Sequence, residues 1–298
     1  MIFDPLEFLR QKELLDTQSD ISASTLDGGF WNDNFRLTGE GIDWVVKHYR
    51  RGQKTSLFPI LPDQESHALT SLQGCEIAPD PVSYFPGKHS VLVYEYWPGD
   101  PWQEDVIPVA HLLRRLHGVQ VRHPGSFRKL ITNPTGLLHQ GDEMLSGAGS
   151  DSLSQRLARL RPDPVRVPDL PKKSLLHTDV GAGNIIVGPR GTRLIDWQCP
   201  GMGDPAEDLW AFLSPAFQML FERTPIAAAQ RAAFLGAYGN PETTYRLNLL
   251  SPFFSYRMSA YCCLRSLELQ ETDPKLSVHY RKAAGAQIEE LETGRTQK

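Results

Sequence analysis

The feature that most constrains this 298-residue chain is a predicted β-hairpin with polar residues at its open ends. Residues 185–187 and 192–195 form two short apolar runs, and a Gly-Pro-Arg-Gly turn at 188–191 separates them. Asn184 enters the first run and Asp196 leaves the second. Because an antiparallel hairpin brings its open ends together, we expect the oxygens of these two side chains to converge.

The residue types around this hairpin are typical of one kind of chemistry. A carboxylate beside an amide oxygen suits Mg²⁺, a hard cation that prefers oxygen ligands. Asp179 lies on the loop just before the hairpin, so it is free to face another group. A base, a pair of metal ligands and intervening glycines favour phosphoryl transfer. The alternative is a surface hairpin whose polar ends are merely solvated.

The order of motifs resembles that of the aminoglycoside phosphotransferase and choline kinase family. The resemblance rests on His-x-Asp-x-x-x-x-Asn, Ile-Asp-Trp and Gly-Asp-Pro-x-x-Asp-Leu, which occupy residues 177–184, 195–197 and 203–209. Thr178 stands where the family usually has glycine, and we expect its hydroxyl not to disturb Asp179. The resemblance implies an α+β, protein-kinase-like fold of two lobes. We expect a β-rich nucleotide-binding lobe at about 1–97. A helical lobe at about 98–298 would carry the catalytic loop and the acceptor pocket.

The resemblance also implies a role for each motif residue. Asp179 would be the catalytic base, while Asn184 and Asp196 would hold Mg²⁺ on the nucleotide phosphates. His177 and Asp208 would support the catalytic loop. The expected donor is ATP, and the sequence does not exclude GTP.

Two glycines in the first lobe resemble the family's phosphate-binding loop. Gly28, Gly29 and Asn32 match its glycine and asparagine positions, whereas Trp31 replaces a small residue. Backbone N–H groups beside glycine can approach phosphate oxygens closely. A Gly-Gly pair is, however, more often a simple hairpin turn.

A lysine and a glutamate are predicted to pair in the first lobe. Residues 42–49 form a β-rich run that carries Lys47, and a helix begins at Pro62 and ends near Gly74. Glu65 lies on the apolar stripe of that helix, where a carboxylate requires a cation. We expect a Lys47–Glu65 ion pair, with Lys47 reaching the nucleotide phosphates as in protein kinases. The alternatives are a solvated lysine and a glutamate that only complements the helix dipole.

The strand at 90–95 is predicted to end in the hinge between the lobes. It is followed by Pro98-Gly99, which breaks a strand. The resemblance implies that backbone groups of Glu95, Tyr96 and Trp97 hold the adenine edge. An ordinary strand followed by a turn would have the same sequence.

Two further features have simpler structural interpretations. His117 ends a predicted helix that starts at Val106, as a helix-end cation or a packed core residue. Asp204 and Glu207 are the expected cap and third position of another helix.

Composition excludes several other classes of protein. The formal net charge is −4, with 31 basic and 35 acidic residues, so nothing favours nucleic acid or an anionic membrane surface. The first 16 residues read as an amphipathic helix and lack the apolar centre of a signal peptide. No apolar run approaches the length of a membrane span. The four cysteines show neither a disulfide framework nor zinc spacing, which favours a cytoplasmic protein.

The acceptor is the least determined part of the prediction. We expect a small-molecule hydroxyl of the aminoglycoside type, or alternatively choline, ethanolamine, thiamine or a sugar. Glu268, Glu271 and Asp273 are candidate contacts for an amine-rich drug, although a solvated helix end explains them better. Aromatic residues of the C-terminal helices could surround a quaternary ammonium but are more often core. A catalytically inactive nucleotide-binding scaffold is the alternative from another class, and the sequence indicates no oligomeric state.

Overall fold

The computed structural model describes all residues except 1–2, 27–31, 51–54, 56 and 297–298. The chain forms two compact units. The first contains residues 1–100 and 186–200, and the second contains residues 101–185 and 201–298. The segment that carries Asp196 therefore groups with the N-terminal residues. The expected division of lobes near residue 97 stays a prediction.

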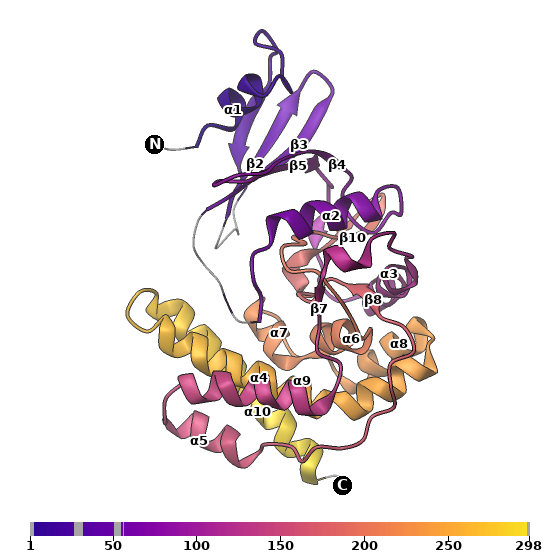
Figure 1. Cartoon of the computed structure of the whole chain (residues 1–298), viewed down its shortest axis with the longest axis vertical. Helices are drawn as coiled ribbons and strands as arrows, with labels where there is room; N and C mark the ends of the chain where they lie inside the picture. The colour runs from indigo at the N-terminus through magenta and orange to yellow at the C-terminus, as the bar shows by residue number, and fades with distance from the viewer. Residues whose placement is uncertain (1–2, 27–31, 51–54, 56, 297–298) are drawn as a thin grey trace. The chain divides into compact units, whose positions relative to one another are not determined.

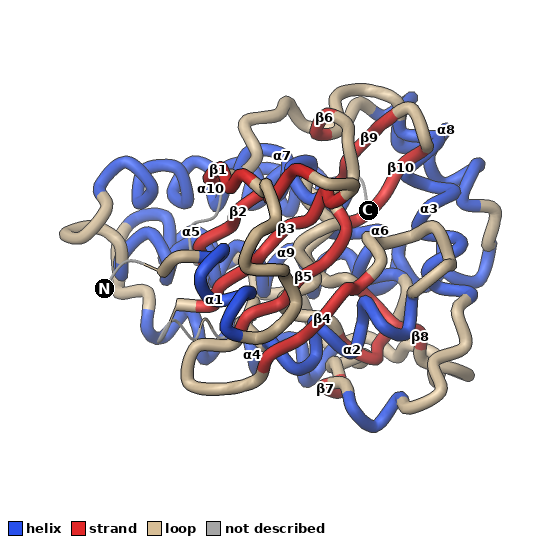
Figure 2. Tube along the Cα trace, turned by 90° about the horizontal axis from the view of Figure 1, so that it is seen from above, coloured by secondary structure: helices blue, strands red, loops and turns tan. Residues whose placement is uncertain are grey.

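An antiparallel five-stranded sheet forms the centre of the first unit. The strands lie in the order β1 (Ser22–Thr25), β2 (Asn32–Gly39), β3 (Ile42–Tyr49), β5 (Val91–Glu95) and β4 (Pro81–Phe85), as Figure 2 shows. The predicted β-rich run at 42–49 is thus a strand with neighbours on both sides. Its position in the interior of the sheet explains why Val46 and Lys47 are both buried.

Two helices accompany this sheet. Helix α1 (Pro5–Gln11) begins at Asp4, whose carboxylate accepts the backbone N–H groups of Leu6 and Glu7. Leu9 of α1 belongs to an apolar cluster with β-strand residues, among them Leu37, Val46, Val91 and Val93. Helix α2 (Pro62–Leu72) has proline at its first position, as expected, and buries Glu65 together with its apolar face.

The second unit is mainly helical (Figure 1). Its helices are α3 (Val106–Gly118), α4 (Pro134–Gly147), α5 (Ser152–Arg159), α6 (Ala206–Leu213), α7 (Pro215–Leu220), α8 (Ala228–Tyr238), α9 (Pro241–Glu268) and α10 (Pro274–Thr296), with short 3₁₀ turns η1 (Pro124–Ser126) and η2 (Ala182–Asn184). The long helix α9 packs against α4, α6 and α10. Its central residues are buried over three turns because neighbours surround it. The α+β class expected from the sequence is confirmed.

Two small sheets hold the connections around the predicted hairpin. Strands β7 (Arg128–Lys129), β11 (Gly201–Gly203) and β8 (Ser174–Leu176) form one sheet, with β11 in the middle. The hairpin itself is present as β9 (Ile185–Gly188) and β10 (Gly191–Leu194), and β9 also pairs with β6 (Asp100–Pro101). Strand β8 leads directly into His177, so this sheet fixes the start of the predicted catalytic loop.

None of the helices in the described part of the chain combines the length and the apolar character needed to cross a membrane. None of the four cysteines forms a disulfide bond, and Cys199, Cys262 and Cys263 are buried.

Candidate active site

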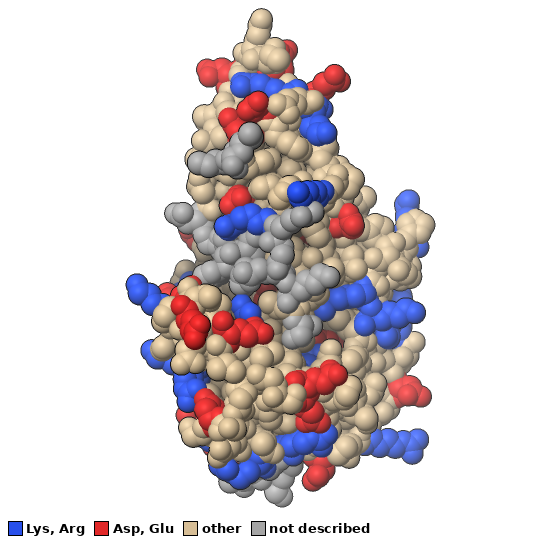
Figure 3. All heavy atoms as spheres, turned by 60° about the vertical axis from the view of Figure 1, so that its left-hand side comes forward, with Lys and Arg blue, Asp and Glu red and all other residues tan. Residues whose placement is uncertain are grey.

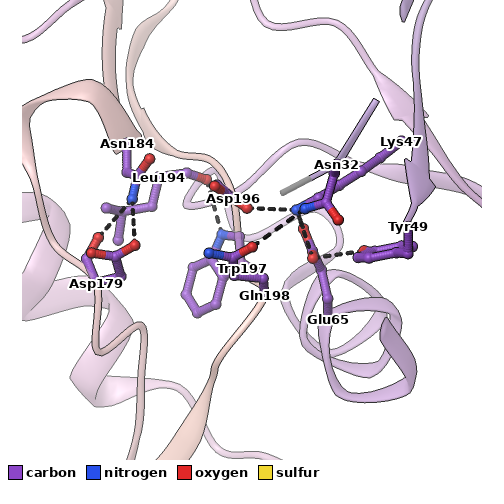
Figure 4. Close-up of polar contacts among 10 residues, drawn as sticks. All are labelled: Asn32, Lys47, Tyr49, Glu65, Asp179, Asn184, Leu194, Asp196, Trp197 and Gln198. Atoms are coloured by element: carbon purple, nitrogen blue, oxygen red, sulfur yellow. Dashed lines mark hydrogen bonds and ion pairs between the residues drawn. The ribbon is translucent and has the colours of Figure 1, made fainter. Parts of the chain in front are cut away.

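The first unit brings a buried lysine together with two carboxylates. Lys47 Nζ on β3 lies 2.9 and 2.8 Å from the two oxygens of Glu65 on α2. It also lies 2.5 Å from Oδ1 of Asp196, which follows β10 (Figure 4). Lys47 and Glu65 are only 2% and 1% exposed, whereas the Asp196 side chain is 36% exposed. The predicted Lys47–Glu65 ion pair is confirmed, and Asp196 is a second partner that the sequence did not indicate.

The charges in this cluster do not cancel. Burial alone would lower the pKa of Lys47, but the negative charges of Asp196 and Glu65 raise it above its ordinary value. The pKa of Glu65 is raised because burial, together with the charge of Asp196, outweighs the attraction of Lys47. Two carboxylates thus share one ammonium, so the formal negative charge of the three side chains exceeds the positive charge by one. Such a cluster favours the approach of a further cation.

Tyr49 completes the cluster on the face of β3 that carries Lys47. Its hydroxyl donates a 2.6 Å hydrogen bond to Glu65 Oε2, and Lys47 Nζ lies 5.2 Å from its ring centroid. Burial and the neighbouring Glu65 charge raise the pKa of Tyr49 well above its ordinary value, so the phenol stays a donor. Sequence reasoning missed Tyr49, although its place two residues after Lys47 puts it on the same side of the strand.

The residues after Asp196 are anchored at two points. Asp196 has a φ of +60°, a left-handed conformation that few residues other than glycine adopt. Two residues later, the Gln198 carbonyl accepts the N–H of Leu61 at 2.8 Å, just before α2. The Gln198 side chain also accepts a 3.4 Å hydrogen bond from Asn32 Nδ2 (Figure 4). Gln198 thereby ties the Asp196 segment to both α2 and β2.

Asn32 is the described member of the predicted glycine loop. It is 5% exposed, and its Oδ1 atom has no hydrogen-bond partner within the described residues. A buried amide oxygen that lacks a hydrogen-bond partner is typical of a site that binds a ligand or ordered water. Gly28 and Gly29, the predicted phosphate-binding glycines, lie outside the described residues.

The predicted hinge residues lie where β5 ends. The backbone N–H groups of Glu95 and Tyr96 are bonded to the carbonyls of Asp80 and Asp43 at 2.9 and 2.8 Å. An adenine edge at this segment would therefore meet carbonyl oxygens or the N–H of Trp97. The Trp97 indole is covered by two guanidinium groups, those of Arg190 and Arg193, at 4.2 and 4.0 Å from its ring centroid.

The second unit places Asp179 and Asn184 in contact. Asn184 Nδ2 donates to the backbone oxygen of Asp179 at 2.9 Å and to its carboxylate Oδ2 at 3.1 Å (Figure 4). Because the amide nitrogen is engaged with Asp179, the amide oxygen is the group that Asn184 can offer to a metal. Asp179 is half-buried.

Asp208 on α6 fixes the residues just before Asp179. It is fully buried and accepts the backbone N–H groups of His177 and Thr178 at 2.9 and 2.8 Å. His117 Nε2 lies 3.2 Å from the same carboxylate, and its Nδ1 lies 2.9 Å from the hydroxyl of Tyr238. His117 is therefore a packed core residue at a helix end, as one of its two interpretations proposed.

A phenyl ring packs directly on the glycines of this loop. A methyl group added at Gly181 would lie 1.7 Å from Phe221, and one at Gly183 would lie 2.8 Å from it. The loop between Asp179 and Asn184 can hold this ring only because both positions lack a side chain.

Helix α6 begins at Ala206, so Asp204 lies one residue before the cap rather than at it, and Glu207 is the second helical residue rather than the third. Both carboxylates also form ion pairs. Asp204 Oδ1 accepts the N–H of Ala206 at 3.0 Å, as a cap would, but its Oδ2 binds the buried Arg246 at 2.7 Å. Glu207 is buried against Arg257. Both arginines come from α9, so no local pattern in the sequence indicates either ion pair.

Comparison with known proteins agrees with this arrangement. The model of the phosphotransferase enzyme family APH matches residues 22–249. Thiamine kinase of Escherichia coli O1:K1 is 29% identical over 195 residues, and thiamine kinase of Shigella dysenteriae serotype 1 is 29% identical over 196 residues. Each match covers 63% of this chain and 65% of the relative, so it spans just under two thirds of the length of these kinases.

Solved structures with the same fold cover nearly the whole chain. Spectinomycin phosphotransferase, solved with ADP and spectinomycin, has a TM-score of 0.66 at 16% identity and covers 96% of this chain and 95% of its own. Choline kinase from Cryptosporidium parvum has a TM-score of 0.65 at 13% identity, with coverages of 98% and 94%. These similarities show the protein-kinase-like fold predicted from the sequence. On the extent of the family match, the chain belongs to the APH phosphotransferase enzyme family.

Proposed function

We propose that this protein is an ATP-dependent kinase that transfers the γ-phosphoryl group to a hydroxyl of a small molecule. The observation that carries the proposal is the buried Lys47–Glu65–Asp196 cluster. A lysine held this way by a carboxylate is the part of a kinase that pairs with nucleotide phosphates. A structural ion pair would not need the second, half-exposed carboxylate of Asp196.

The residues present fit a bound nucleotide and Mg²⁺. The cluster has one negative charge more than its lysine neutralises, and Asn184 turns its amide oxygen away from Asp179. Asn184 and Asp196 would hold the metal, since amide and carboxylate oxygens are its preferred ligands. Bound Mg²⁺ would neutralise charge on the transferring phosphoryl group. Lys47 would orient the nucleotide phosphates, and Asp179 would orient the acceptor hydroxyl and accept its proton.

Two of the three candidate carboxylates for an amine-rich acceptor already have partners in the structure. Glu268 is paired with Arg265 of the same helix, and Asp273 accepts the N–H of Leu276 at 3.0 Å. The helix-end interpretation of these residues is thereby favoured over contact with an aminoglycoside. Phe221, which follows α7 and packs on Gly181 and Gly183, provides an apolar surface beside the loop that carries Asp179. This surface favours a less charged acceptor with an apolar or ring portion. Thiamine, choline and sugar alcohols are therefore the first acceptors to test.

The distribution of charge on the surface bears on whether the protein binds nucleic acid. On the face shown in Figure 3, acidic and basic side chains of the described residues are interspersed. This face offers no continuous basic surface for nucleic acid. A cytoplasmic location stays a prediction.

The test is ADP release from MgATP in the presence of a library of small hydroxyl compounds. We expect one acceptor class to stimulate release, and D179N to lower kcat for that acceptor by at least about 100-fold, because general-base catalysis contributes 10²–10⁴-fold. ATP binding by D179N should be unchanged. Removing Mg²⁺ with a chelator should abolish transfer.

A catalytically inactive scaffold would give a different result. It would bind MgATP with unchanged affinity in the D179N chain and release no ADP with any acceptor. Failure of the wild-type chain to bind MgATP at all would contradict both functions.

A further inference from the structure

Thr178 holds a backbone conformation that its side chain disfavours. Its φ is +69°, in the left-handed region, where a β-branched residue is a genuine outlier. The residue is 5% exposed and immediately precedes Asp179. Conformations of this kind cost of order 1–3 kcal/mol and persist only where neighbours enforce them. Glycine, the usual family residue here, would adopt the same φ without strain.

Two hydrogen bonds enforce this conformation from opposite ends of the residue. The backbone N–H donates to Asp208 Oδ1 at 2.8 Å. The side-chain hydroxyl accepts a hydrogen bond from Arg128 Nη2 at 3.1 Å. The first bond is available to any residue at position 178, whereas the second requires a hydroxyl.

The sheet beside the loop explains how Arg128 reaches Thr178. Arg128 on β7 pairs with Gly201 on β11, and Gly201 pairs with Leu176 on β8. Leu176 is two residues before Thr178. The cation is thus carried by a strand whose register with the catalytic loop is fixed by backbone hydrogen bonds. Nothing in the sequence motif indicates this residue, which lies 50 positions before Thr178.

We propose that Arg128 is a positioning residue of the transfer reaction, holding the strained Thr178 so that Asp179 faces the acceptor hydroxyl. The inference rests on the proposed function. A change in φ at residue 178 would swing the following carboxylate, and a misplacement of about 1 Å at a reacting group can lower the rate about 100-fold. A glycine at position 178 would need no such clamp, since glycine is not strained there.

If Arg128 acts through Thr178, the effect of replacing Arg128 on kcat should depend on the residue at position 178. The T178V chain keeps the branched side chain and loses the hydroxyl, and R128M removes the donor. Each should lower kcat at least about 10-fold while the KM for ATP changes less than about twofold. T178S retains the hydroxyl and T178G removes the strain, so each should lower kcat less than T178V does.

The decisive measurement is kcat for R128M in the wild-type and in the T178G backgrounds, with the acceptor found in the library screen. We expect the substitution to lower kcat in the first background and to have no further effect in the second. An equal loss in both backgrounds would overturn the inference, because Arg128 would then act on something other than Thr178. A T178V chain with wild-type kcat would overturn it as well.

Failure of the proposed function is a separate outcome. A wild-type chain that transfers phosphate to no acceptor removes the catalytic role of this contact along with the kinase. The clamp itself is then tested by unfolding, where R128M should lower the melting temperature of the wild-type background more than that of the T178G background. Equal shifts in the two backgrounds would overturn the clamp.

Discussion

The hydroxyl of Tyr49 donates a 2.6 Å hydrogen bond to Oε2 of Glu65 inside the first unit. Glu65 is 1% exposed, so this bond and the two contacts with Lys47 replace its hydration. The Y49F chain should therefore lose about 1–3 kcal/mol of unfolding free energy, the cost of leaving a buried acceptor less satisfied. It should also bind ATP more weakly, because Glu65 would then hold Lys47 less firmly.

Denaturant unfolding and the KM for ATP measure these two effects of Y49F. Y84F is the matched control, since Tyr84 donates to Asp63 at a more exposed place in the same unit. We expect Y84F to leave the KM for ATP unchanged. Equal KM values for Y49F and the wild type would show that Glu65 holds Lys47 in place without the hydrogen bond from Tyr49.

Glu290 of α10 gives the second unit a pH dependence of stability. Burial raises its pKa above the ordinary value of 4.5, against the opposing effects of Arg231, Gln287 and Ser255. A carboxyl whose pKa is raised by folding stabilises the protein while it is protonated. That contribution is present below pH 4.5 and is lost as the pH rises through the folded-state value. E290Q should accordingly melt higher than the wild type at pH 7.5.

The prediction for Glu290 is checked by melting both chains from pH 4 to pH 8. The difference in melting temperature between E290Q and the wild type should grow with pH, because glutamine cannot ionise. A difference that is constant across this range would contradict the assignment.

The contact of Phe221 with the catalytic loop predicts a rescue experiment. The G181A chain should lose most transfer activity, and its free energy of unfolding should fall by at least about 1–3 kcal/mol, because the added methyl group would overlap the phenyl ring. The double variant G181A/F221A should regain part of both. G236A is the control, because open space surrounds Gly236 inside helix α8 and alanine should stabilise it by about 0.5–1 kcal/mol. A double variant no better than G181A would show that the loop backbone itself rejects a side chain.

Asp208 should be among the most sensitive positions of the second unit. D208N replaces an acceptor of two backbone N–H groups by a side chain that is half donor, in a fully buried place. We expect a loss of at least about 2 kcal/mol in unfolding free energy. D43N, which removes a partly exposed ion pair with Arg36, should cost less than about 1 kcal/mol. Similar melting temperatures for the two variants would contradict the role assigned to Asp208.

The sequence was informative where a pattern is local. The hairpin, the strand carrying Lys47 and the helix carrying Glu65 could be predicted, because turn residues, β-branched runs and a first-position proline act within a few residues. The Lys47–Glu65 pair followed from one rule, that a carboxylate on an apolar helix face requires a cation.

The contacts missed by the sequence analysis join residues far apart in the chain. Asp196 is 149 positions from Lys47, and Arg246 is 42 positions from Asp204. No spacing rule connects such positions, since tertiary packing alone brings them together. The expectation that Thr178 is a neutral replacement for glycine was incomplete for a related reason. The conformational free energy of threonine at this position depends on the backbone φ, which the residue type does not reveal.

The convergence of His117, His177 and Thr178 on the single carboxylate of Asp208 has a thermodynamic consequence. The loop before Asp179 is ordered by contacts made within the core, so its conformational entropy is lost when the chain folds. In the proposed reaction, an incoming alcohol would then meet a loop that is already ordered. Binding of the acceptor would then not have to order this loop, so less of its binding free energy would be lost to conformational entropy. This arrangement favours fast turnover of weakly bound acceptors.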